Sequence, residues 1–122
     1  MNIKHVLTAL ALTLSLGACG KGGDIDAFMK LDTDKAKAFD AGGDDCVAKA
    51  KSVGDWRTAH TKDYKAMQKK LADQYKGPPP ADVMEKYGAQ IKANKKSVMD
   101  AMMKCTSDPA FSKMMDDTKA AE

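Results

Sequence analysis

The chain has 122 residues, with 20 lysine or arginine residues against 17 aspartate or glutamate residues and only 6% aromatic residues. This length favours one domain over two, and the nearly balanced charge gives no reason to expect a nucleic-acid partner. After residue 18, alanine, lysine, methionine and aspartate dominate, while β-branched residues are sparse. This composition predicts helices and argues against a β-sheet domain.

The first expected element is an export signal. A head with a positive charge at Lys4 precedes an apolar run over residues 6–16. This run of 11 residues is too short for a membrane-spanning helix, which needs about 20. A charged head, a short apolar stretch and small residues at its end are typical of a cleaved secretory signal peptide. We therefore expect residues 1–18 to be removed.

The signal ends in Leu16-Gly17-Ala18-Cys19. This segment resembles the lipobox of bacterial lipoproteins, in which a leucine and two small residues precede the cysteine that becomes lipidated. The resemblance implies cleavage before Cys19, acyl chains on Cys19 and the lipid bilayer as a partner. Two or more acyl chains make such an attachment durable, whereas one chain holds a protein only marginally. The alternative is an ordinary cleaved signal followed by a chance cysteine.

The same resemblance bears on location. It implies the bacterial cell envelope, and Gly20 in place of an aspartate after Cys19 favours the outer membrane, facing the periplasm. Residues 19–23 are expected to be the lipidated cysteine and a flexible tether, whose last four residues span at most ~14 Å. Any protein partner would therefore be met at the membrane surface.

Residues 24–122 are expected to form a small antiparallel helical bundle, all-α, with three main helices and a short C-terminal helix. The first helix is expected over about residues 24–41 and ends at Gly42-Gly43. Its apolar face comprises Ile25, Phe28, either Met29 or Leu31, Ala36 and Phe39. These residues recur at the spacing of one helical face.

The second helix is expected over residues 44–76. Asp44 and Asp45 suit an N-cap and a first-turn acid, and Gly77 and three prolines end the helix. Gly54 either kinks one continuous helix, which we favour, or breaks it. The apolar seam comprises Cys46, Ala50, Val53, Trp56, His60, Tyr64, Met67, Leu71 and Tyr75.

The third helix is expected over residues 82–105 and the fourth over residues 109–119. Asp108 suits the N-cap of the fourth helix and Pro109 its first position. The seam of the third helix repeats every seven residues at Met84, Ile91, Val98 and Cys105, with Tyr87, Asn94 and Ala101 between them. Such a repeat is typical of a bundle face.

Two cysteines, Cys46 and Cys105, remain after removal of the signal, and export would place them in an oxidising compartment. They form no CxxC pair and have no histidine nearby, so a structural disulfide is favoured over two separate thiols. The proline loop lies between them, so an antiparallel hairpin of the second and third helices would bring both cysteines to its open end. We expect the disulfide to clamp that end.

His60 is the single histidine after residue 18 and lies on the apolar seam of the second helix. With Met67, Met99 or Met102 it offers a candidate ligand set for haem or another metal. The favoured interpretation is a packed histidine, core-filling methionines and no cofactor. A further alternative is that Met103, Met114 and Met115 line a groove.

No HExxH, GxSxG or phosphate-loop signature is present, so we do not expect an enzyme. The expected function is a non-catalytic interaction or structural module of the envelope. The alternative is a small protein that binds a ligand, a metal or haem through His60 and methionines. Nine lysines between residues 60 and 96 make the proline-loop end basic, either as an ordinary solvated face or as a surface for anionic headgroups.

Overall fold

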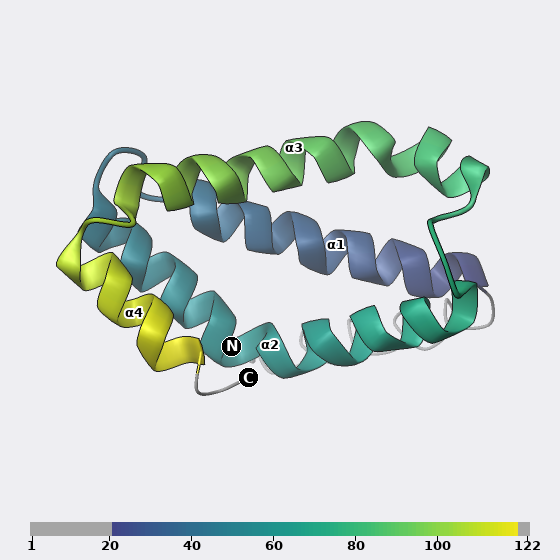
Figure 1. Cartoon of the computed structure of the whole chain (residues 1–122), viewed down its shortest axis with the longest axis horizontal. Helices are drawn as coiled ribbons and strands as arrows, with labels where there is room; N and C mark the ends of the chain where they lie inside the picture. The colour runs from purple at the N-terminus through teal and green to yellow at the C-terminus, as the bar shows by residue number, and fades with distance from the viewer. Residues whose placement is uncertain (1–20, 120–122) are drawn as a thin grey trace, which may run out of the picture.

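The computed structural model describes residues 21–119, which form α-helices joined by short turns, with no strand in this range. These are α1 (Lys21–Asp40), α2 (Cys46–Tyr75), α3 (Ala81–Cys105) and α4 (Pro109–Lys119). The expected all-α bundle of three long helices and a short fourth is confirmed. Figure 1 shows α1, α2 and α3 running back and forth along the molecule, with α4 beside the first part of α2. The predicted signal peptide and the lipidation residue Cys19 lie outside the described residues.

The arrangement of the long helices depends on α1. It packs against both α2 and α3, and α4 packs against α2. The arms α2 and α3 are joined at one end by the proline loop, residues 76–80, and at the other by the Cys46–Cys105 disulfide, with an S–S distance of 2.06 Å. The predicted clamp is confirmed. Between these two connections α2 and α3 diverge (Figure 1), so each arm packs on α1 rather than on the other arm.

The buried core lies at the disulfide end. Its members come from all four helices and are Phe39, Ala50, Val53, Ala101, Cys105 and Phe111. Val53, Cys105 and Phe111 have essentially no exposed surface. Met102, Met114 and Met115 pack against this cluster as expected for adaptable core fillers. Cys105 belongs to this cluster and Cys46 packs against it, so the covalent bridge is part of the core.

The start of α2 differs from the expected one by two residues. Asp45, not Asp44, is the N-cap, and its Oδ1 accepts hydrogen bonds of 3.0 and 3.1 Å from backbone N–H groups of the first turn. The helix therefore begins at Cys46. Asp44 instead forms an ion pair with Lys104 at the end of α3, a long-range contact that local capping rules do not predict.

The end of α1 is closed by a lysine from the next helix. Lys49 is buried, and its Nζ donates hydrogen bonds to the carbonyl oxygens of Phe39 and, at 3.3 Å, of Ala41. The last carbonyl groups of a helix lack partners within the helix and carry a partial negative charge. The ammonium of Lys49 supplies these carbonyl groups with hydrogen-bond donors and a positive charge. Its burial therefore stabilises the turn between α1 and α2.

The second helix is continuous through Gly54, as favoured from the sequence, and Figure 1 shows that it bends along its length. A Cβ atom at Gly54 would lie 3.0 Å from the Cγ of Met114, so the glycine permits the close approach of α4. The prediction that Gly77 caps the C-terminus is wrong. Gly77 directly precedes Pro78, and a residue that precedes proline is restricted to extended backbone. Lys76 therefore takes the left-handed conformation in its place, with φ 45°.

The first turn of α1 also differs from the expected one. The helix begins at Lys21, so residues 21–23 of the predicted tether are helical. Ile25 and Met29 are buried on the next turns, and their packing outweighs the weak helix propensity of the glycines. Met29, rather than Leu31, completes the buried face of α1.

Met84 is not on the inward face of α3, because its side chain is 43% exposed. A straight helix rotates ~20° per heptad relative to an exact seven-residue repeat. Met84 lies three heptads before Cys105, so the accumulated rotation turns its side chain away from the face of α3 that packs on α1. Val83 takes the inward position instead.

Candidate functional site

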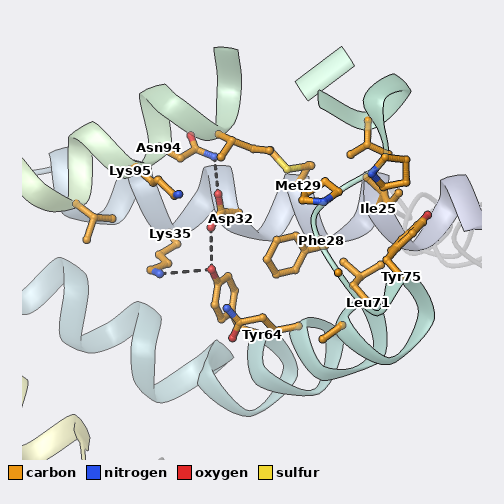
Figure 2. Close-up of a pocket in the computed structure, with 18 of the residues that line it drawn as sticks. Ile25, Phe28, Met29, Asp32, Lys35, Tyr64, Leu71, Tyr75, Asn94 and Lys95 are labelled. Carbon is orange, nitrogen blue, oxygen red and sulfur yellow. Dashed lines mark hydrogen bonds between the residues drawn. The ribbon is translucent and has the colours of Figure 1, made fainter. Parts of the chain in front are cut away.

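A cavity of about 570 Å³ lies between α2 and α3 on the surface of α1, next to the proline loop. It exists because the two arms diverge there. Most of the lining is apolar, and the apolar residues are Ile25, Phe28, Met29, Leu71, Ala72, Tyr75, Pro79, Pro80, Val83, Ile91, Val98 and Met99. Figure 2 shows side chains from all three helices turned toward this space.

One face of each long helix supplies the lining. Lining positions recur at 25, 28, 29, 32 and 35 on α1, at 64, 68, 71, 72 and 75 on α2, and at 91, 94, 95, 98 and 99 on α3. Spacings of three and four residues put side chains on the same face of a helix. The same periodicity therefore builds the core at the disulfide end and the cavity wall at the proline-loop end.

Three polar side chains, one from each long helix, join at the cavity (Figure 2). Tyr64 of α2 donates a hydrogen bond of 2.9 Å to Oδ1 of Asp32 in α1, and Asn94 of α3 donates one of 2.8 Å to its Oδ2. Asn94 is buried and accepts a further hydrogen bond of 2.9 Å from Gln90. Buried polar groups cost stability unless they are paired. The cluster therefore fixes where α2 and α3 sit relative to α1.

The ring of Tyr64 is held on several sides. The ring of Phe28 lies 5.2 Å away and that of Trp56 lies edge-on at 5.8 Å, measured between centroids. The ammonium of Lys35 lies 4.6 Å from the ring centre and donates a 3.5 Å hydrogen bond to the hydroxyl oxygen. Aromatic and cation–π contacts of this kind each add roughly 0.5–1.5 kcal/mol. Tyr64 is thus a fixed part of the cavity wall.

The environment of Tyr64 determines its protonation. Partial burial, the negative charge of Asp32 and the hydrogen bond to Asp32 all raise the pKa of Tyr64. The hydroxyl therefore remains a hydrogen-bond donor, and both carboxylate oxygens of Asp32 accept hydrogen bonds. Such a cluster is suited to positioning and recognition rather than to proton transfer.

We expect the free energy of unfolding to fall as the pH rises above about 10, the ordinary pKa of tyrosine. In the unfolded chain Tyr64 loses its proton near that pH, whereas the folded protein holds the proton to higher pH. The folded state then binds more protons, so stability is present in full below pH 10 and is lost as the pH rises. Urea unfolding of the parent and of Tyr64→Phe across this range measures the effect. An identical pH dependence in the two proteins would contradict it.

The residues singled out from the sequence have different surroundings. Cys46 and Cys105 are bonded to each other. Among the candidate metal ligands, the ring of His60 packs 5.4 Å from that of Trp56, Met102 packs against the core and Met99 is largely exposed. Only Met99 of these three lines the cavity. Within residues 21–119, no group of three or more His, Cys, Asp or Glu side chains could hold a metal ion.

Asp32 was not anticipated as a site residue, although the sequence holds a signal for it. It lies four residues after Phe28 and four before Ala36, so it interrupts the apolar face of α1. A carboxylate at such a position requires donors from neighbouring helices. Tyr64 and Asn94 are polar members of the two predicted seams and supply those donors.

Comparison of the chain with protein-family models, with curated proteins and with solved structures finds no match. Among the helices of residues 21–119, none combines the length and the apolar character needed to cross a membrane.

Proposed function

We propose that this chain is an envelope lipoprotein whose helical domain is a non-catalytic module that binds an apolar molecule in the cavity between α2 and α3. The observation that supports this function is the apolar lining of a space of about 570 Å³. Ligand sites are typically concave, ~300–1,000 Å³ in volume and mostly apolar, with a few polar groups that orient the ligand. The Tyr64–Asp32–Asn94 cluster is such a polar group.

An apolar molecule is favoured over haem or a metal ion. His60 and Met102 do not line the cavity, so the candidate ligand set from the sequence is not gathered around one space. Each methylene moved from water into an apolar site contributes ~0.8 kcal/mol. A hydrocarbon chain therefore gains affinity from the lining that is present.

The proposed anchor is the lipidated Cys19, in the outer membrane and facing the periplasm. The first turns of α1 adjoin the proline loop, because Asp24 pairs with Lys70 at 3.1 Å and Asp26 with Lys86 at 3.3 Å. An anchor preceding α1 would hold this end of the domain, with the cavity, toward the bilayer. Metabolic labelling with palmitate tests the anchor, and equal labelling of a Cys19→Ser variant would reject it.

Binding can be tested without the anchor. All four helices, the disulfide and the buried core lie within residues 21–119. A chain that lacks residues 1–18 and carries Cys19→Ser therefore retains the described fold. This soluble form avoids detergent, which would compete for an apolar cavity.

We expect this form to bind N-phenyl-1-naphthylamine, a neutral fluorophore that brightens in apolar surroundings, in a saturable manner. Ala72 lines the cavity and is exposed, so Ala72→Phe should fill part of the space without disturbing the core. Displacing the equivalent of about two buried methylenes weakens binding roughly tenfold. Fluorescence titration measures both dissociation constants.

The matched control is Ala59→Phe, at an exposed position of α2 that does not line the cavity. Its affinity should equal that of the parent. Absence of saturable binding to the parent would reject the proposed function. Equal weakening by both variants would show that the fluorophore binds somewhere other than the cavity.

A further inference from the structure

We infer that the cavity takes a single-chain amphiphile with an anionic head group, an inference that rests on the proposed binding function. The head would lie beside Lys35 and Lys95, and the hydrocarbon chain would extend toward the proline loop. Three features of the lining support this assignment. The charged residues lie at one end of the cavity, the net charge of the lining is positive, and Lys35 lies over the ring of Tyr64.

All three charged residues of the lining lie at one end of the cavity, where Val98 and Met99 also line it, whereas the other end carries no charge. Figure 2 shows Lys35 and Lys95 together on one side of Asp32, with Ile25, Leu71 and Tyr75 on the opposite side. Pro79 and Pro80 of the proline loop also line the cavity. A molecule that matches both ends has a polar head and an apolar tail, because a purely apolar molecule would leave the charged end unmatched.

The charge at the polar end is positive. The charged residues that line the cavity are Asp32, Lys35 and Lys95, so the lining carries one excess positive charge. The negative charge of Asp32 is shared with two donors, because Tyr64 and Asn94 each donate to one of its oxygens. An incoming anion therefore meets two ammonium groups and a carboxylate that is already hydrogen-bonded.

A cationic head group is disfavoured by the same arrangement. The ring of Tyr64 beside the carboxylate of Asp32 would otherwise suit an ammonium ligand. Lys35 occupies that position, with its Nζ 4.6 Å from the ring centre. A cationic ligand would have to displace this side chain, whereas an anionic one can approach it.

The test compares three amphiphiles with the same chain length as competitors of N-phenyl-1-naphthylamine, each kept below its micelle concentration or, for dodecanol, below its solubility limit. They are dodecanoate, dodecanol and dodecyltrimethylammonium. Dodecanoate is expected to bind at least about fivefold more tightly than dodecanol, and the cationic compound more weakly than either. Lys95→Glu should abolish the preference for dodecanoate over dodecanol.

Lys92→Glu is the matched control, since Lys92 is an exposed residue of α3 that does not line the cavity. It changes the net charge by the same amount, so a preference that persists in Lys92→Glu and is lost in Lys95→Glu supports a local head-group site. Equal affinity for dodecanoate and dodecanol would overturn the inference while the proposed function stands. Loss of the preference in both variants would also overturn it. If the parent binds no fluorophore in a saturable manner, the proposed function fails as well.

Discussion

Reduction of the Cys46–Cys105 disulfide is expected to lower the free energy of unfolding by about 4 kcal/mol. The bond joins residues separated by 59 positions, so it removes much of the conformational freedom of the unfolded chain. Domains of this size are usually stable by only about 5–15 kcal/mol. This bond would therefore supply a large part of the stability of the domain, and the reduced protein should unfold at a much lower urea concentration.

Urea unfolding of the oxidised and reduced proteins, followed by circular dichroism, measures this loss. The variant Cys46→Ala/Cys105→Ala separates the cross-link from packing of the sulfur atoms. Both reduced and substituted proteins lack the bond, but only the variant also lacks the sulfur of Cys105, which is fully buried in the core. The variant should be less stable than the reduced parent by about 1 kcal/mol or more. Coincident curves for oxidised and reduced parent would refute the expected role of the disulfide.

The second large effect is expected from Gly42→Ala, which should lower the free energy of unfolding by about 2–4 kcal/mol. Gly42 has φ +84°, a conformation that side chains rarely adopt. A Cβ atom there would lie 2.8 Å from the backbone nitrogen of Lys49. Since that nitrogen belongs to the first turn of α2, the turn must shift, and the Lys49 bonds that close α1 would be disturbed.

Gly43→Ala separates strain from steric contact. Gly43 also has a positive φ, +54°, but a Cβ atom there would meet no atom within 4 Å. Its substitution should cost only about 1 kcal/mol, the usual penalty for a residue in the left-handed conformation. Thermal unfolding of the two variants gives the comparison. Equal losses would mean that the contact with α2 does not matter.

Much of the fold could be predicted because its signals are local. The paired glycines after α1, the prolines after α2, and Asp108 before α4 each mark a boundary through backbone geometry or capping. Asp108 accepts a hydrogen bond of 3.0 Å from the backbone N–H of Phe111, as an N-cap should. The disulfide followed from the count and positions of the cysteines. Errors at Asp44 and Gly77 amount to shifts of one or two residues.

The cavity could not be predicted in the same way. Periodicity identifies an apolar face, but it does not say whether the facing helix fills the space next to it. Tyr64 and Leu71 belong to the same seam as Val53, yet Val53 is fully buried and the other two line the cavity. The difference arises because α2 and α3 diverge toward the proline loop while both pack on α1. That arrangement depends on contacts between residues that are far apart in the chain.

The placement of core and cavity at opposite ends of the same helices has a consequence for how such a protein can evolve. Substitutions at the proline-loop end would change the lining of the proposed binding site, whereas Phe39, Val53, Phe111 and the disulfide stabilise the other end. The effects of substitutions at well-separated positions are close to additive, so a change at the cavity need not alter the packing of the core. Because α1 belongs to both ends, its first and second halves would be under different selective constraints.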